Sequence, residues 1–313
     1  MLTVMFSSHN GAAVLPQTLD SMVRALPPAG GWKLVAVDNA STDTSAALLE
    51  SYKDRLPLTL LHEPQPGKNR ALNRALARAE GDLFIFCDDD VVVEPDWLVQ
   101  WRALADSKPD YALFAGSTRP LWPFEPPDWI KNDVEASIVF ATNEYMREGR
   151  CPPIAMFGTN MAIRASVFAD GLRFNENIGP DGSGAYAMGS ETELATRLAA
   201  LGHQCLFSNA PMVRHIIRAK QMERVWILLR AYRWGRGQAQ MKIAHTYPPP
   251  RLKRKNLLRW ALYRFLMPFY SHKEAWARQW EWMIDQGHED GWRESHGRGP
   301  RWKRGSKGPL IAA

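Results

Sequence analysis

Short apolar runs alternate with amphipathic segments along the first third of the chain. The apolar runs have the length and the β-branched or aromatic content of buried strands, and each ends in polar or turn residues. The predicted strands are 2–6, 33–37 and 83–87, and the predicted helices are 15–26, 44–56 and 68–79. Because strands and helices alternate, the pattern predicts an α/β fold with a mostly parallel sheet flanked by helices.

Polar residues follow each predicted strand, at the edge of a parallel sheet where ligands bind. They are Ser7 to Gly11 after the first strand, Asp38 to Asp43 after the second, and Asp88 to Asp90 after the third. We expect the three clusters to meet at one edge. Capping of the next helix by Thr42 or Asp43 explains part of the second cluster, but not Asp38, which stands directly at the strand end.

The adjacent acids Asp88, Asp89 and Asp90 form a carboxylate triplet. Acids at a strand end are often solvated turn residues. However, like charges within one turn repel, and a fold that keeps them together usually supplies a cation. A hard ion such as Mn²⁺ or Mg²⁺, held by one or two carboxylates plus substrate phosphates, is a second interpretation, and the triplet alone leaves both open.

Composition limits the class of protein. The chain has 313 residues with 45% apolar content, which is enough to bury one large core or two smaller ones. We find no pattern typical of a signal peptide and no uncharged apolar run of about 18 residues, so we expect a soluble or peripheral protein. Cys87, Cys151 and Cys205 are odd in number and widely spaced, which argues against a disulfide framework and fits a reducing cytoplasm.

Charge and tryptophan are distributed unevenly along the chain. Residues 1–217 hold 18 Lys and Arg against 26 Asp and Glu, whereas 218–313 hold 21 against 7 and eight of the 13 tryptophans. Together with the breaker run 247–250, this shift predicts a main domain over 1–217 and a basic, Trp-rich helical extension over 218–313. The tail 297–313 has a composition typical of disorder.

The extension allows several interpretations. Segments 255–268 and 275–285 place Trp, Leu and Phe among Lys and Arg. These segments fit helices packed on the main domain, an aromatic and basic surface lying on an anionic membrane, or a cationic face for an acidic polymer. The charge alone would also suit nucleic acid, but no nucleic-acid-binding motif occurs, so we expect none as a partner.

Several segments occur in a defined order along the chain: HN with L, L and M near the start, VDNASTD, PGKNRALNRALARAEGD, FCDDDVVVEPDWL, and a second half with FGTNMAIRASVFADGLRF, GSETELATRLAALGH and Val213-Arg214-His215. Together they resemble the family 2 glycosyltransferases, which have the GT-A fold. The resemblance covers about residues 1–235. It implies that the main domain binds a nucleotide-sugar donor and transfers the sugar with inversion.

The resemblance also implies roles for single residues. Asp38 is expected to contact the nucleotide base, and Lys68 to lie near that base or the diphosphate. Asp88 and Asp90 match the two acids of the DxD motif, with Asp90 on the metal and Asp88 near the ribose. His215 stands where a late histidine joins the metal or diphosphate, although a satisfied structural histidine is the alternative. Further implied donor contacts are Ser7, His9, Asp89, Gly158 and Asn160.

The segment GSETELATRL contains the candidate base. It resembles a family pattern of two adjacent acids, a third acid two residues on, and a later arginine. Ser190 replaces the first acid and Glu191 stands where Asp is commoner, so Glu191 is the candidate general base. Glu193 and Arg197 are four residues apart, and we interpret them as a structural ion pair.

The resemblance therefore implies an inverting glycosyltransferase that uses Mn²⁺ or Mg²⁺ and a UDP-, GDP- or dTDP-linked sugar. A glycan or lipid-linked acceptor in surface polysaccharide or glycoconjugate assembly is implied. From the cysteines we expect a cytoplasmic enzyme, and one interpretation of the basic extension places it at the inner face of the membrane. The stretch 117–150 and the extension are expected to hold the acceptor contacts. Two alternatives are a nucleotidyltransferase, for which SSHNGAAV is a poor phosphate loop, and a non-catalytic binding relative, which Ser190 would fit.

Overall fold

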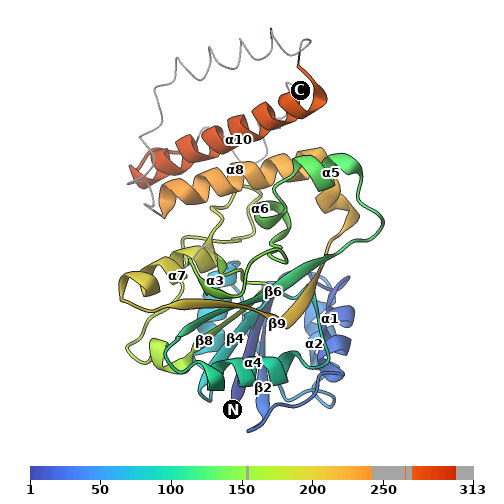
Figure 1. Cartoon of the computed structure of the whole chain (residues 1–313), viewed down its shortest axis with the longest axis vertical. Helices are drawn as coiled ribbons and strands as arrows, with labels where there is room; N and C mark the ends of the chain where they lie inside the picture. The colour runs from blue at the N-terminus through green and yellow to red at the C-terminus, as the bar shows by residue number, and fades with distance from the viewer. Residues whose placement is uncertain (153–154, 242–264, 266–269, 301–313) are drawn as a thin grey trace. The chain divides into compact units, whose positions relative to one another are not determined.

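The computed structural model describes residues 1–152, 155–241, 265 and 270–300, and they form two compact units. Unit 1 comprises Met1–Leu121, Phe140–Glu176 and Ser190–Ile216, and unit 2 comprises Trp122–Val139, Asn177–Gly189 and Ile217–Ala313. Unit 1 contains the sheet and unit 2 contains the long helices of the C-terminal part (Figure 1).

Unit 1 is built on a nine-stranded sheet in the order β3-β2-β1-β4-β8-β6-β9-β5, with β7 paired to β9. The strands are β1 (Leu2–Ser8), β2 (Trp32–Asn39), β3 (Leu58–Glu63), β4 (Leu83–Cys87), β5 (Val91–Val93), β6 (Leu113–Leu121), β7 (Gly149–Cys151), β8 (Asn160–Arg164) and β9 (Cys205–Ile216). Strands β3, β2, β1 and β4 are parallel, as are β6 and β9, whereas β5, β7 and β8 pair antiparallel. The predicted α/β class with a mostly parallel sheet is confirmed.

Helices connect these strands. They are α1 (Leu15–Val23), α2 (Ser45–Glu50), α3 (Lys68–Leu76), α4 (Trp97–Ser107), α7 (Ser190–Ala200) and the 3₁₀ helix η2 (Ala165–Phe168). All three predicted strands and all three predicted helices occur, and the helices end three to six residues earlier than predicted. β3 was not predicted because its sequence, LTLLHE, mixes apolar with polar residues and so forms no continuous apolar run.

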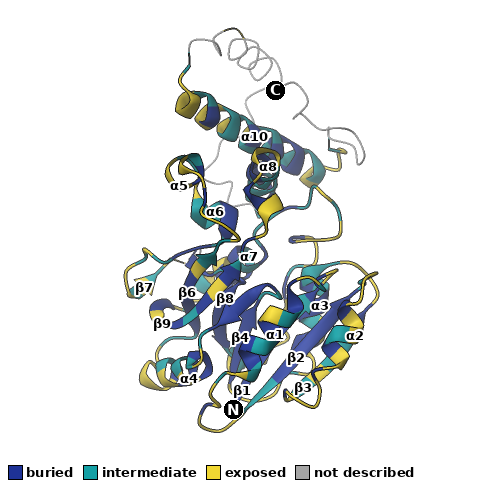
Figure 2. Ribbon diagram, turned by 90° about the vertical axis from the view of Figure 1, so that its right-hand side faces the viewer, coloured by how far each residue is buried: buried dark blue, intermediate teal, exposed yellow. Residues whose placement is uncertain are grey.

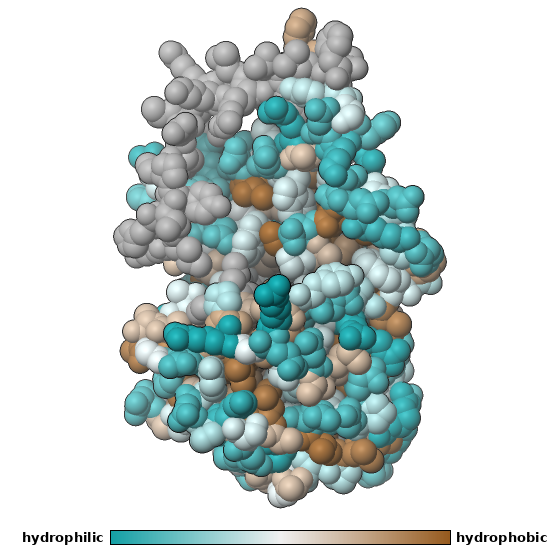
Figure 3. All heavy atoms as spheres, in the orientation of Figure 1, coloured by the Kyte–Doolittle hydropathy of each residue, from teal (hydrophilic) through white to brown (hydrophobic). Residues whose placement is uncertain are grey.

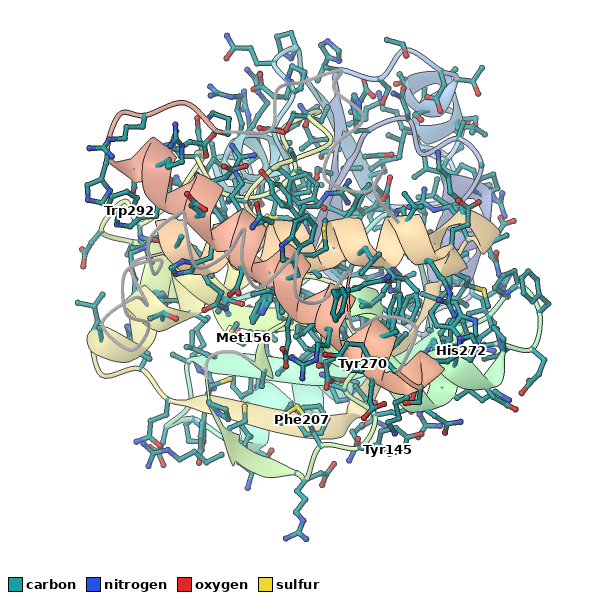
Figure 4. All side chains as sticks on the ribbon, turned by 90° about the horizontal axis from the view of Figure 1, so that it is seen from above. Tyr145, Met156, Phe207, Tyr270, His272 and Trp292 are labelled. Atoms are coloured by element: carbon teal, nitrogen blue, oxygen red, sulfur yellow. The ribbon has the colours of Figure 1, made fainter. Side chains whose placement is uncertain are left out.

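The sheet is apolar on both faces. In β1, Leu2, Val4 and Phe6 belong to one core and Met5 to the other, because successive side chains point to opposite faces. The first core lies under α1 and α4, and the second under α3 and α7. Met156 and Phe207, both labelled in Figure 4, belong to the second core. Burial on both faces explains why the strand sequences are continuously apolar (Figure 2).

Unit 2 consists mainly of helices. They are α5 (Asp128–Asp133), most of α6 (Ala136–Phe140), the 3₁₀ helix η3 (Ala219–Met222), α8 (Arg224–Gln240) and α10 (His272–Ser295). Arg224, at the start of α8, lies over the ring of Trp276, near the start of α10. Gln240, at the end of α8, donates to Glu294, near the end of α10. The two helices therefore run in the same direction. All six described tryptophans of 218–313 are buried or half-buried, as expected of packed helices.

Two predictions for the extension fall partly outside the described residues: the segment 255–268, apart from Phe265, and the tail beyond residue 300. The segment 275–285 lies within α10. Among the described helices, none combines the length and the apolar character that a membrane-spanning helix needs. On the face shown in Figure 3, hydrophilic residues cover most of the described surface and hydrophobic ones are scattered.

Candidate functional site

The polar clusters after β1, β2 and β4 meet at one edge of the sheet, as predicted. Strands β1, β2 and β4 end at this edge and β8 begins there, with Cys87 opposite Asn160. Hydrogen bonds join the first two loops: Asn39 O lies 2.7 Å from His9 Nδ1, and Gly11 N donates to Ser45 Oγ at 2.9 Å. The loops after β1 and β2 are therefore held together at this edge by hydrogen bonds.

Each acid of the carboxylate triplet has its own partner. Repulsion between neighbouring carboxylates is reduced when each is paired or hydrogen-bonded to a different group. The partners come from an α-helix, from β1 and from β9, elements that are far apart in the sequence. Asp88 Oδ1 lies 2.6 Å from Lys68 Nζ, Asp89 accepts a hydrogen bond from Ser8 Oγ, and Asp90 Oδ1 lies 3.3 Å from His215 Nε2.

Lys68 also binds the candidate base. Its Nζ donates to Asp88 Oδ1 at 2.6 Å and to Glu191 Oε1 at 2.7 Å. The exposed fractions of the three side chains are 17%, 26% and 15% for Lys68, Asp88 and Glu191, so the cluster is largely shielded from water. Burial alone would lower the pKa of Lys68, but the two carboxylates outweigh it and raise the pKa well above the usual range. Lys68 therefore stays charged.

The starts of α3 and α7 place Lys68 and Glu191 in the cluster. Lys68 is the first residue of α3, and Asn39 braces the preceding loop by donating to Gln65 O at 2.8 Å and accepting from Gly67 N at 2.8 Å. Glu191 lies in the first turn of α7. A side chain at Gly158 would collide with Glu191 Oε1 and Lys68 Nζ, so only glycine leaves room for the two groups to meet.

Asp90 and His215 form the second part of the site, and their side chains are 11% and 10% exposed. His215 Nδ1 lies 2.6 Å from Phe140 O. Because a carbonyl only accepts, Nδ1 carries the proton and Nε2 faces Asp90 Oδ1. Burial would lower the pKa of His215, but Asp90 and the Phe140 carbonyl raise it above its ordinary value. The pair is thus arranged to hold a proton or a cation between oxygen and nitrogen.

This pair fits a divalent cation such as Mn²⁺, which accepts carboxylate and imidazole ligands. The hydrogen bond from Nδ1 to a backbone carbonyl is the usual way in which a ligating histidine is oriented. Within the described ranges, however, no three His, Cys, Asp or Glu side chains converge as a metal site. A cation held by Asp90 and His215 would need further oxygen ligands, which phosphate groups and water can supply.

Asp38 lies at the end of β2 and is 2% exposed. Its Oδ2 lies 2.9 Å from Nδ1 of His62, which stands directly opposite on β3. Its Oδ1 is buried and has no hydrogen-bond partner among the described residues. A buried acceptor without a partner is costly, so a donor group on a ligand, such as an N–H of a nucleobase, would satisfy it.

The other predicted site residues take different positions. Asn160 is 1% exposed, and its amide accepts from Trp97 Nε1 at 2.9 Å and donates to Ser117 O and Pro211 O at 2.8 Å. This side chain thus holds β8 to its neighbours. Ser7 is half-buried in β1 and His9 is exposed. Glu193 and Arg197 pair at 2.7 Å, as the helical spacing predicted.

Sequence reasoning did not identify three contributors. Ser8 binds Asp89, His62 binds Asp38, and the carbonyl of Phe140 orients His215. Ser8 belongs to a polar cluster that was predicted, but the strand continues to it, so it rather than Ser7 faces the triplet. Recognition of β3 would have placed His62 opposite Asp38. A backbone carbonyl leaves no signal in the sequence.

Comparison with solved structures supports the class of fold. A mannosyltransferase from Pyrobaculum calidifontis, in complex with GDP-Man and Mn²⁺, aligns with a TM-score of 0.59 at 19% identity over 91% of this chain and 85% of that chain. Staphylococcus aureus TarS 1-349, in complex with UDP-GlcNAc, aligns with a TM-score of 0.53 at 15% identity over 96% and 93%. The fold is that of the GT-A glycosyltransferases.

The family follows from the sequence itself. The model of the family described as Glycosyl transferase family 2 matches residues 3–171, more than half of the chain. The chain belongs to this family and is a glycosyltransferase. The family prediction is thereby confirmed, and the nucleotidyltransferase alternative is set aside.

Curated relatives are distant. The succinoglycan biosynthesis protein ExoM of Rhizobium meliloti is 24% identical over 72% of this chain and 71% of its own length. The probable glycosyltransferase YdaM of Bacillus subtilis is 25% identical over 86% of this chain and 62% of its own length. The poly(ribitol-phosphate) β-N-acetylglucosaminyltransferase TarS of Staphylococcus aureus is 27% identical over 33% of this chain, which spans only 18% of TarS.

Proposed function

We propose that this glycosyltransferase moves a sugar from a nucleotide-diphosphate sugar to a hydroxyl group of a glycan or lipid-linked acceptor, with inversion and with a divalent cation. The observation that carries the proposal is the clustering of Asp88, Lys68 and Glu191 beside the Asp90–His215 pair. It places acids, one fixed positive charge and a candidate base at the strand ends, where ligands of such sheets bind.

The roles follow from the chemistry of the side chains. Asp38 accepts from the nucleobase, and Lys68 contacts the diphosphate. Asp90 and His215 would hold Mn²⁺ or Mg²⁺, and such an ion would supply positive charge against the charge that develops on the leaving diphosphate. Asp88 lies toward the ribose. Ser7, His9, Asp89, Gly158 and Asn160 shape the donor site, Ser7 from β1, Asn160 from β8 and the other three from the loops at the strand ends.

Glu191 is the proposed general base. It accepts the proton of the acceptor hydroxyl as the oxygen attacks the anomeric carbon and the nucleoside diphosphate departs. A single base that activates the acceptor requires no enzyme nucleophile, and one displacement inverts the anomeric configuration. The position of Glu191 in the first turn of α7 favours its ionised form, because the helix N-terminus carries partial positive charge.

Support for the biological setting comes from the relatives, whose names refer to succinoglycan and to poly(ribitol-phosphate). We propose assembly of a surface polysaccharide or glycoconjugate on the cytoplasmic side of the membrane. The stretch 117–150, with Tyr145 93% exposed (Figure 4), is proposed to contact the acceptor. The basic extension 218–313 is proposed to bring the enzyme to an anionic membrane surface, and we expect no nucleic acid as a partner.

A donor panel tests the proposal. Binding and hydrolysis of UDP-, GDP- and dTDP-sugars are measured with Mn²⁺, with Mg²⁺ and with chelator. We expect one base to be preferred and binding to require the metal. In the variant Asp90→Ala, metal-dependent donor binding should be lost, whereas Asp110→Ala, on an exposed side chain outside the cluster, should bind normally. Absence of binding for every donor, or an unchanged titration of Asp90→Ala, would refute the proposal.

A further inference from the structure

Lys68 joins two acids with different proposed tasks. It donates to Asp88 at 2.6 Å, beside the donor site, and to Glu191 at 2.7 Å, the proposed base. These two acids lie on β4's exit and on α7, and Lys68 begins α3. The ammonium group is therefore the physical link between the site for the diphosphate and the group that activates the acceptor.

The Lys68 ammonium cannot pair equally strongly with Asp88, Glu191 and a bound diphosphate at the same time. It has three N–H groups, and two are directed at carboxylates in this structure. A bound diphosphate adds negative charge at the same place and competes for the ammonium. While Glu191 Oε1 accepts from Lys68, the neighbouring positive charge stabilises the ionised carboxylate and makes it a weaker acceptor for the proton of an acceptor hydroxyl.

Lysine at position 68 and glycine at position 158 suit a contact between Lys68 and Glu191 that forms and breaks. Lysine carries a compact charge on a flexible stem, whereas arginine would hold a carboxylate through two fixed hydrogen bonds. At Gly158, a Cβ would lie 2.8 Å from Lys68 Nζ and would also overlap Glu191 Oε1. The missing side chain thus leaves the space in which the ammonium and the carboxylate meet.

We infer that Lys68 is a latch that couples donor binding to the release of the base. In the free enzyme Lys68 holds Glu191, and the donor diphosphate draws the ammonium away, which frees Glu191 for the acceptor. Lys68 is in this respect a positioning residue for Glu191. The inference rests on the proposed function, since it assumes that a nucleoside diphosphate binds beside Asp88.

Competition has a thermodynamic consequence that can be measured without turnover. If Glu191 and the diphosphate compete for Lys68, removal of the charge of Glu191 must strengthen diphosphate binding. We expect Glu191→Gln to lower the dissociation constant of the tightest of UDP, GDP and dTDP, with Mn²⁺, by about threefold to tenfold in calorimetry. Lys68→Gln should raise it by about tenfold.

A double-mutant cycle separates the latch from simple repulsion between Glu191 and the diphosphate. In the Lys68→Gln background, Glu191→Gln should leave the dissociation constant unchanged within about twofold. Glu193→Gln is the matched control, because it removes one charge from the same helix turn but from a carboxylate paired with Arg197. Thermal unfolding of each variant checks that the fold is intact.

The outcomes are distinguishable. Tightening by Glu191→Gln that persists without Lys68 means direct repulsion and overturns the latch. Equal effects of Glu191→Gln and Glu193→Gln overturn it as well, and this comparison can still overturn the latch when Lys68→Gln does not fold. If none of the three nucleoside diphosphates binds the wild-type enzyme with Mn²⁺, the proposed function fails and the latch fails with it.

Discussion

At the scale of single residues, the site is a set of charges that are paired in different ways. Asp88 is balanced by a lysine, Asp89 by a hydroxyl group and Asp90 by a histidine. Only the last pair leaves an oxygen and a nitrogen facing each other as potential metal ligands. The three neighbouring acids therefore have different partners, which three identical residues in the sequence do not indicate.

Glu191 provides the first prediction at this scale. Glu191→Gln keeps the shape of the side chain but cannot accept a proton, so we expect kcat to fall by about 10² to 10⁴. Donor binding should not weaken. The measurement is steady-state transfer with saturating donor, and Glu193→Gln should transfer at close to the wild-type rate. Turnover of Glu191→Gln near the wild-type rate would contradict the role of base.

Glu63 provides a prediction on pH and stability. It is 6% exposed and accepts hydrogen bonds from Gln65 N at 3.0 Å and Arg74 Nε at 2.9 Å. Burial would raise the pKa of Glu63, but these partners outweigh it and lower the pKa. The stabilisation is therefore present above the unfolded pKa of about 4.3 and is lost as pH falls through the lower folded pKa.

We expect Glu63→Gln to lower the free energy of unfolding at pH 7 by about 1 to 3 kcal/mol. The difference from wild type should shrink as the pH falls below about 4, because wild-type Glu63 then also becomes neutral. Urea unfolding across this range measures both values. Glu80→Gln, on an acid that is 60% exposed and paired with Lys33, should cost less than about 1 kcal/mol. A difference that stays constant with pH would exclude the linkage.

At the scale of elements, the parallel strands and the helix starts do the positioning. Lys68 and Glu191 are 123 residues apart, yet each lies in the first turn of a helix that begins at the same edge of the sheet. Strand pairing likewise places Cys151 opposite Cys205 with their Sγ atoms 3.1 Å apart, although both thiols are free. Their spacing in the sequence did not indicate this contact.

Close packing of α8 and α10 leads to a prediction on stability. Gly287 lies so near the neighbouring helix that a Cβ would collide with Tyr232 O, and Gly235 is equally close to Ile284 O. Gly→Ala normally stabilises a helix by about 0.5 to 1 kcal/mol. Here we expect Gly287→Ala to destabilise unit 2 by about 1 to 3 kcal/mol, because a backbone carbonyl cannot move aside cheaply.

Thermal unfolding followed by circular dichroism at 222 nm measures this change. Gly299→Ala is the control, since a Cβ at Gly299 meets no atom within 4 Å. A melting temperature of Gly287→Ala at or above that of wild type would show that the two helices have room to separate.

At the scale of the whole molecule, the two parts of the chain differ most clearly in net charge. Residues 218–313 carry 21 Lys and Arg against 7 Asp and Glu, while residues 1–217 are net acidic. Each basic residue near an anionic membrane surface contributes about 1 kcal/mol to binding, and salt screens the attraction. The described tryptophans of the extension are not exposed, so the contact would be electrostatic.

We therefore expect the protein to sediment with vesicles that contain phosphatidylglycerol at low salt and to dissociate from them at about 0.5 M NaCl. Vesicles of phosphatidylcholine alone should not bind it. Binding to neither kind, or binding that salt does not weaken, would argue against the membrane role of the extension. Either result would leave the donor site unaffected.

The sequence alone determined the class of fold and the edge at which the site lies. Continuous apolar runs such as 83–87 indicate strands buried on both faces, and parallel strands require their carboxyl ends to meet. These are local properties, set by burial and by strand direction, so residue patterns carry them. The positions of Asp38, Asp88 and Glu191 at helix and strand ends followed for the same reason.

Only the tertiary structure decided which of these residues touch. The link from Lys68 to both Asp88 and Glu191, the contact of Asp38 with His62, and the orientation of His215 by a backbone carbonyl all join distant segments. Such contacts depend on strand order and side-chain direction, and on the space left at Gly158. None of these is a local property, and a pattern along the chain cannot specify them.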